Sequence, residues 1–126
     1  MPARFRLTLA QLNPSVGDIP ANAAKAREAW DQGKEANADL VALTEMFITG
    51  YQTQDLILRP AFIADAIAAN TTLAHDCADG PALGIGGPAL KDGHLHNAYY
   101  ILQGGQILTI LKHELPNDSV FDEKRV

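Results

Sequence analysis

The sequence of 126 residues predicts an α/β domain with a mixed sheet and helices on one face. Three observations lead to this prediction. Amphipathic helical stretches alternate with short apolar runs, which indicates β-α-β units with parallel pairing. A glycine-rich apolar run follows the second helical stretch, and two more runs separated by Gly104-Gly105 indicate an antiparallel hairpin. Two helices on one face of five strands leave the other face in need of a partner layer.

The first half of the chain contains two predicted strands around one helix. Residues 5–12 begin with alternating apolar and polar side chains, as a half-buried strand does. Residues 13–20 are rich in turn formers, and we interpret them as an ordered, fold-defining turn rather than a site. Residues 21–37 carry alanines and Trp30 on one helical face and charges on the other. Residues 39–43 form the second strand.

The second half contains a longer helix and three strands. Pro60 suits the first position of that helix. Its apolar stripe consists of Ile63, Ala66, Ile67, Leu73 and Cys77. Residues 82–87 read as a strand whose G-x-G-G pattern lacks the G-K-[ST] of a phosphate loop, so close backbone packing is the better interpretation. Residues 95–102 and 107–111 form the hairpin, and residues 112–126 are expected to be a polar, irregular tail.

The composition argues against several classes of function. A net charge of −5 disfavours a nucleic-acid groove, and no apolar run approaches the roughly 20 residues of a membrane span. The single cysteine, Cys77, suits a reducing compartment, so we expect a cytoplasmic protein. His94 and His96 share a strand face at a spacing that suits a metal. With no third ligand nearby, a polar hairpin edge is the better interpretation, and no metal site is expected.

Glu45 is the strongest candidate for a functional residue. It comes just after an apolar run, residues 40–43, and shortly before a turn at Gly50-Tyr51. In open α/β sheets, ligands and catalytic side chains gather at the carboxyl ends of strands. A charge next to apolar residues is costly to bury unless it has partners or a task. The structural alternatives are a helix cap or a surface carboxylate, and Lys112 alone would read as a solvated lysine.

Four segments of the sequence resemble a known family. They are Ala10–Pro14 with Gly17-Asp18, Glu45–Tyr51, Asp55-Leu56 with Pro60–Phe62, and Lys112–Asn117 with Val120–Val126. The glutamate and lysine segments resemble those of the nitrilase (carbon–nitrogen hydrolase) superfamily, and the last segment resembles the N-terminal glutaminase domain of bacterial glutamine-dependent NAD synthetases. The resemblance covers the chain but only the first part of that domain. It implies that residues 1–126 are an incomplete, nitrilase-like α-β-β-α sandwich.

The resemblance implies an amidase that uses a glutamate, a lysine and a cysteine. The thiolate attacks the side-chain amide of glutamine, ammonia leaves, and water hydrolyses the thioester. Glu45 matches the general base, for which a pKa raised by burial is suitable. Lys112 matches the lysine that stabilises the oxyanion and keeps the carboxylate ionised. Glu123 matches an additional glutamate near that lysine. Asp118 replaces a tyrosine of the glutamine pocket, where it would meet the substrate's α-ammonium unless the pocket is built otherwise.

The resemblance supplies no nucleophile within this sequence. The family's cysteine follows the lysine segment on a later strand, beyond Val126. Cys77 precedes Lys112 and lies on the apolar stripe of a predicted helix, where a thiol is protonated and inert. We therefore expect a partial copy of the domain that is inactive alone.

The resemblance also implies the partners. The chain would be the glutamine-hydrolysing part of an ATP-dependent NAD synthetase, which releases ammonia to amidate deamido-NAD. No cofactor is expected in this chain, and ATP and magnesium would bind a synthetase domain outside it. A homo-oligomer is expected, and the uncovered sheet face should make the isolated chain self-associate. Two alternatives stay open: a stand-alone nitrilase-type amidase acting on another small amide, and a non-catalytic assembly fragment.

Overall fold

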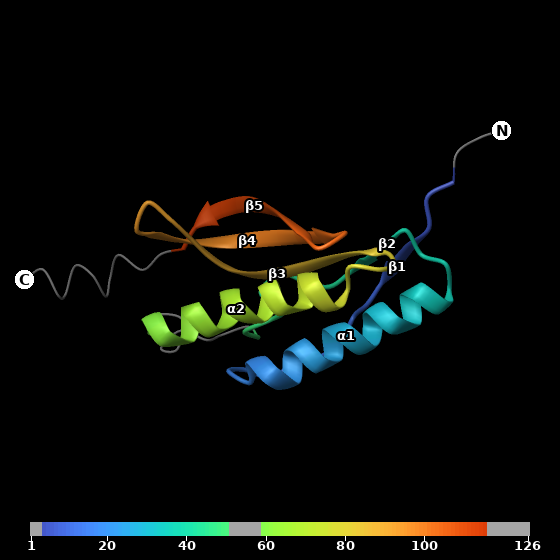
Figure 1. Cartoon of the computed structure of the whole chain (residues 1–126). Coiled ribbons are helices and arrows are strands. Elements are labelled where there is room, and N and C mark those ends of the chain that lie inside the picture. The colour runs from blue at the N-terminus through green and yellow to red at the C-terminus, as the bar shows by residue number, and fades with distance from the viewer. Residues whose placement is uncertain (1–3, 51–58, 116–126) are drawn as a thin grey trace, which may run out of the picture.

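The computed structural model describes residues 4–50 and 59–115 (Figure 1). Within these ranges, two helices and five strands follow one another in the predicted order. In chain order they are β1 (Leu7–Leu9), α1 (Ile19–Glu35), β2 (Leu40–Ala42), α2 (Pro60–Asp76), β3 (Ala82–Lys91), β4 (His94–Gln103) and β5 (Gln106–Glu114).

The five strands form one sheet in the order β1-β2-β3-β4-β5. β1 pairs with β2, and β2 with β3, in parallel. The pairs β3–β4 and β4–β5 are antiparallel. Both helices lie on the same face of this sheet and pack against each other (Figure 1). The predicted fold class, a mixed α/β sheet with helices on one face, is therefore confirmed.

The register separates the two faces of the sheet. One row of paired residues crosses all five strands as Thr8, Val41, Leu83, Leu102 and Ile107. Its three central members are 0% exposed, which places this row under the helices. The next row is Leu9, Ala42, Gly84, Ile101 and Leu108. Because successive side chains point to opposite faces, this second row lies on the face without helices, where Leu9 is 71% and Leu108 60% exposed.

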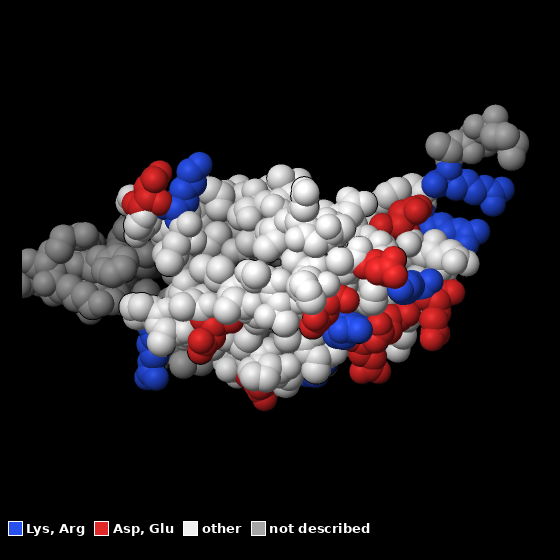
Figure 2. All heavy atoms as spheres, in the orientation of Figure 1, with Lys and Arg blue, Asp and Glu red and all other residues white. Residues whose placement is uncertain are grey.

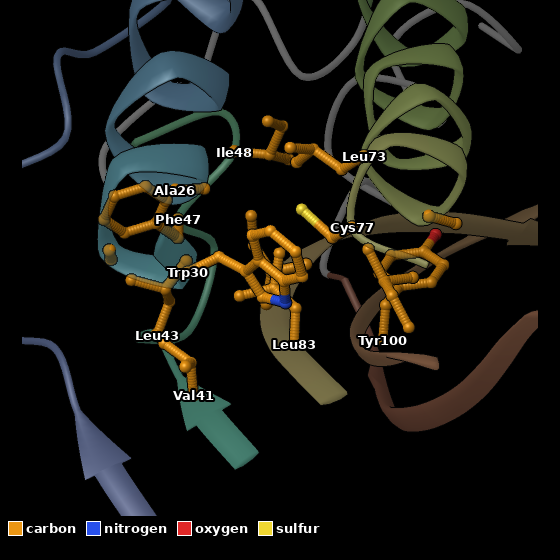
Figure 3. Close-up of a cluster of buried hydrophobic side chains, with 14 of the residues drawn as sticks. Ala26, Trp30, Val41, Leu43, Phe47, Ile48, Leu73, Cys77, Leu83 and Tyr100 are labelled. Atoms are coloured by element: carbon orange, nitrogen blue, oxygen red, sulfur yellow. The ribbon is translucent and has the colours of Figure 1, made fainter. Parts of the chain in front are cut away.

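The hydrophobic core lies between the helices and the sheet (Figure 3). Trp30 of α1, Val41 of β2 and Leu83 of β3 are at most 3% exposed. Phe47 and Ile48, from the turn that follows β2, are 0% exposed and reach into the same cluster. This burial anchors the turn after β2, and so determines where the polar residues beside it can lie.

The boundaries of several elements differ from the prediction. α1 begins at Ile19 rather than residue 21, because the Asp18 carboxylate accepts a hydrogen bond of 3.1 Å from the Ala21 amide and caps the helix. β1 is shorter than predicted, since it pairs with only three residues of β2. β3 and β5 are longer because β4 gives both a paired neighbour along its whole length. Lys112 therefore lies in β5 and not in an irregular tail.

Charged side chains are unevenly distributed over the surface. On the side shown in Figure 2 they gather around α1 and the ends of the sheet, and much of the surface over β3, β4 and β5 carries none. Within residues 4–50 and 59–115, neither helix has the length and apolar character needed to cross a membrane.

Candidate active site

The segment after β2 stays attached to β3 before it turns away. The Leu43 amide donates to the Gly84 carbonyl at 2.8 Å. Gly86 then makes two hydrogen bonds, donating to the Thr44 carbonyl at 3.2 Å and accepting from the Ile48 amide at 3.1 Å. The backbone therefore leaves the edge of β3 only between Thr44 and Ile48, in a turn that both flanking hydrogen bonds hold in place.

Glu45 lies in this turn, three residues beyond β2. A Cβ atom on Gly86 would lie 2.7 Å from the Glu45 Cα, a distance that real Cβ contacts essentially never show. Glycine thus allows the turn to cross β3 at this point, which supports close backbone packing as the reason for the G-x-G-G pattern. Met46 has a φ of 52°, in the left-handed region that costs a non-glycine residue roughly 1–2 kcal/mol. The surrounding packing sustains that conformation.

The loop before α1 supports the same turn from its other side. The Asn22 side chain, 0% exposed, accepts from the Ser15 amide at 2.6 Å and donates to the Ser15 and Ile48 carbonyls at 2.8 and 3.1 Å. The Gly17 amide donates to the Thr49 carbonyl at 2.9 Å. These contacts agree with the interpretation of residues 13–20 as a fold-defining turn.

The carboxylate of Glu45 accepts one hydrogen bond on each oxygen. Lys112 Nζ donates to Oε2 at 2.8 Å, across 67 residues of sequence. Asn97 Nδ2 donates to Oε1. The Glu45 and Lys112 side chains are 34% and 41% exposed, so the ion pair is open to solvent on one side. The structure thus brings together the two residues that the sequence singled out, and adds a third.

A bulge in β5 presents Lys112 to this site. Asn97 pairs with His113, whereas Ala98 pairs with Leu111, so Lys112 is the extra residue of the ladder. Such bulges re-aim side chains, often next to active sites. In a regular strand, alternation would turn His113 away from Lys112, but the bulge interrupts that alternation. His113 is in fact one of the groups that lower the pKa of Glu45.

The pKa of Glu45 is lowered from its ordinary value. The largest cause is the hydrogen bond from Lys112, and the next is the hydrogen bond from Asn97. Partial burial acts in the opposite direction but is outweighed. The expectation of a pKa raised by burial was therefore wrong for the described residues, because both carboxylate oxygens have donors. The carboxylate is ionised at neutral pH and able to accept a proton.

Asn97 is the site residue that the sequence reasoning missed. It is 2% exposed, and its Oδ1 has no hydrogen-bond partner among the described residues. The available signal was an asparagine within an otherwise strand-forming run, residues 94–103, because asparagine is depleted in strands. That signal indicates neither the face of the sheet on which the Asn97 side chain lies nor the group to which it is hydrogen-bonded.

Cys77 belongs to the hydrophobic core rather than to the polar cluster of Glu45, Lys112 and Asn97. It caps α2, is 1% exposed and points into the apolar cluster with Trp30 and Leu73 (Figure 3). Burial raises the pKa of its thiol to about 11. This agrees with the expectation of a protonated core thiol.

The remaining predictions concern two histidines and several residues that the structure does not describe. His94 Nδ1 lies 3.3 Å from Glu114 Oε2 at the exposed end of the hairpin. Residues 4–50 and 59–115 contain no group of three or more histidine, cysteine or acidic side chains placed to hold a metal ion. Asp118, Glu123 and the family-like pair Asp55-Leu56 lie outside the described residues.

This chain is similar to carbon–nitrogen hydrolases and to glutamine-dependent NAD(+) synthetases. The family model "Carbon-nitrogen hydrolase" matches residues 6–120. The glutamine-dependent NAD(+) synthetase of Rhodobacter capsulatus is 58% identical over all of this chain and 23% of that relative. The one from Thermotoga maritima is 36% identical over 97% of this chain and 21% of the relative. The chain therefore spans less than a quarter of the length of these relatives.

Solved structures agree with the sequence comparison. Glutamine-dependent NAD+ synthetase from Acinetobacter baumannii, in complex with ADP, superposes with a TM-score of 0.75 at 34% identity, over 96% of this chain and 23% of that one. An amidase from Nesterenkonia sp. gives a TM-score of 0.73 at 19% identity, over 86% of this chain and 42% of that one. The second likeness shows the fold alone.

Proposed function

Because the chain belongs to the carbon–nitrogen hydrolase family, we propose that it is the first part of the glutamine-hydrolysing domain of a glutamine-dependent NAD synthetase. The observation that carries the proposal is the ion pair between Glu45 and Lys112, which joins the turn after β2 to the bulge of β5. The names of the relatives support glutamine as the amide donor. Residues 1–126 then form only part of that domain.

Glu45 acts as the general base in this proposal. Its ionised carboxylate takes the proton of a cysteine thiol, and the thiolate sulfur bonds to the amide carbon of glutamine. The Glu45 acid returns the proton to the amide nitrogen, the C–N bond breaks, and ammonia leaves. The carboxylate then takes a proton from water, which attacks the thioester and releases glutamate and the thiol.

Lys112 stabilises the negative oxygen that forms in both steps. Its ammonium already lies 2.8 Å from Glu45 Oε2, so it needs little movement to face an oxyanion formed beside that carboxylate. Two further roles belong to residues outside the described ranges. Glu123 supports Lys112, and Asp118 contacts the α-ammonium of glutamine.

The nucleophile of this reaction is a cysteine outside residues 1–126. Cys77 is unsuited to the task because the residue is 1% exposed and its thiol stays protonated at neutral pH. Residues 1–126 alone therefore do not hydrolyse glutamine.

The whole protein, in this proposal, uses the released ammonia to amidate deamido-NAD. ATP and magnesium bind a second domain, which the greater length of the relatives accommodates. The protein is cytoplasmic and forms homo-oligomers. In such an assembly, further strands of the glutaminase domain cover the exposed row that includes Leu9 and Leu108.

The proposal is tested on the full-length polypeptide that the gene encodes. Ammonia release from glutamine and NAD formation from deamido-NAD, ATP and magnesium are measured in the same preparation. The proposal predicts both activities, and a Cys77→Ala variant that keeps them. Hydrolysis of another small amide without NAD formation would instead show a stand-alone amidase. Absence of both activities from a folded polypeptide would indicate a non-catalytic assembly protein.

A further inference from the structure

Asn97 occupies a position where a polar side chain requires a reason. It lies in β4, between two paired neighbours, and is 2% exposed. Burying a carboxamide is unfavourable unless hydrogen bonds replace those to water. The described residues supply one such bond, from Nδ2 to Glu45 Oε1, and leave Oδ1 without a partner. The contact with Glu45 is therefore the interaction that accounts for the asparagine.

The orientation of the amide follows from the chemistry of its partner. An amide oxygen facing the carboxylate would bring two acceptors together, so the nitrogen must be the group that faces Oε1. Asn97 is a donor to Glu45 in this arrangement and carries no charge of its own.

The two donors to Glu45 have different properties. Lys112 is a point charge on a long, flexible stem and is 41% exposed. Asn97 has a short side chain that the sheet encloses. Lys112 can therefore move toward an oxyanion during the reaction, whereas Asn97 stays in place on the other carboxylate oxygen. One fixed donor on Oε1 is what keeps the plane of the carboxylate from rotating when Lys112 moves.

We propose that Asn97 is a positioning residue, which holds the Glu45 carboxylate ionised and in the orientation from which it removes a proton. The catalytic consequence rests on the proposed function, whereas the effect of Asn97 on the ionisation of Glu45 does not. The charged or titratable groups within the described residues that act on Glu45 are Lys112 and His113, both from β5. Neither can replace the neutral donor from β4.

The first test is the titration of the Glu45 carboxyl carbon, followed by ¹³C NMR in the full-length polypeptide and assigned by its loss in Glu45→Gln. Asn97→Ala should raise the pKa of Glu45, because a donor to the ionised form is removed. Asn97→Asp keeps the shape of the side chain and should raise this pKa further, because two carboxylates then face each other.

Asn70→Ala is the matched control. Asn70 is a second buried asparagine, 1% exposed, on α2, and its side chain has no hydrogen-bond partner among the described residues. Its replacement should leave the titration of Glu45 unchanged. An Asn97→Ala protein that is folded by circular dichroism and titrates as the wild type does would overturn the proposal.

The second test is kinetic. A hydrogen bond to a charged group, lost in Asn97→Ala, should lower kcat for glutamine hydrolysis about 10- to 100-fold with little change in KM. The acidic limb of the pH profile should move upward with the pKa of Glu45. Asn97→Ser, which keeps a neutral donor, should recover part of the rate.

A merely structural role gives a different result. It would reduce the amount of folded enzyme without moving the acidic limb, and that outcome would overturn the proposal. If the wild type released no ammonia from glutamine, the proposed function would fail, while the NMR titration would still decide the role of Asn97.

Discussion

Gly86 is the residue on which the position of Glu45 depends most directly. Gly86→Ala would place a Cβ atom 2.7 Å from both the Cα and the carbonyl carbon of Glu45. The backbone nitrogen of Met46 would lie closer still, and ordinary van der Waals contact begins at 3.4 Å, so the turn would have to withdraw by at least about 0.7 Å. The obstructing atoms belong to the backbone, and Phe47 and Ile48 anchor the turn in the core. No side-chain rotation can therefore relieve the contact.

The displacement has a predictable consequence for catalysis. A misplacement of about 1 Å can cost on the order of 100-fold in rate, and overpacking costs about 1–3 kcal/mol of stability. We expect Gly86→Ala to lower the rate of ammonia release from glutamine by about 10- to 100-fold in the full-length polypeptide. The Tm should fall as well, and both quantities are measured on the same preparation.

Gly87→Ala provides the matched control. Its Cβ would meet the side chains of Ile48 and Asn70, at 2.8 and 3.2 Å, on the helix face of the sheet. Side chains can shift where backbone cannot, so this variant should lose some stability but keep most of the glutaminase rate. A folded Gly86→Ala protein with the wild-type rate would refute the reasoning that this glycine positions Glu45.

Three further predictions concern other parts of the structure. Asn22→Ala removes two hydrogen bonds between α1 and Ser15 of the preceding loop, and one between α1 and Ile48 of the turn after β2. It should lower the free energy of unfolding by about 1–3 kcal/mol in urea titrations, and an unchanged unfolding midpoint would contradict this. Burial raises the pKa of Cys77 to about 11 in the folded protein, so the stability that the thiol contributes is present below its unfolded pKa of about 8.5 and is lost as pH rises towards 11. In Cys77→Ala, the free energy of unfolding should therefore fall less steeply over this pH range. The same slope in the variant as in the wild type would count against this prediction. Leu9→Ser with Leu108→Ser should reduce self-association of isolated residues 1–126 in analytical sedimentation, whereas a monomeric wild-type fragment would show that the uncovered face does not associate.

The sequence was sufficient for the fold class and for the candidate pair. Periodicity predicted both helices, because their buried stripes repeat at helical spacing, as at Ile63, Ala66 and Leu73. Glu45 and Lys112 were found through motifs that resemble a family. Their direct contact across 67 residues has two causes. β2 and β5 run in the same direction, so that their carboxyl ends lie at the same edge of the sheet, and the turn after β2 crosses β3 towards β4 and β5.

The details around that pair depended on interactions that local patterns do not encode. The β5 bulge at Lys112 arises from the hydrogen-bond register with β4, which no pattern within residues 107–114 indicates. The pKa of Glu45 is lowered because two side chains donate hydrogen bonds to its carboxylate. Asn97 could not be identified from the sequence as one of these donors, because a single asparagine within a strand has no characteristic spacing from its partner. Strand ends were underestimated at Lys91 and Glu114 because pairing with β4 extends them beyond their apolar runs.

The proposed function assigns Glu45 and Lys112 to glutamine hydrolysis and not to the amidation of deamido-NAD. The most direct measurement compares NAD formation by full-length Glu45→Gln and Lys112→Met with glutamine or with free ammonia as the nitrogen source. The same comparison is made for Glu114→Gln, which changes an exposed glutamate of β5. We expect the glutamine-dependent rate to fall at least about 100-fold in the first two variants only, and the ammonia-dependent rate to stay at the wild-type level in all three. Equal loss of both rates, or no loss of either, would contradict the account.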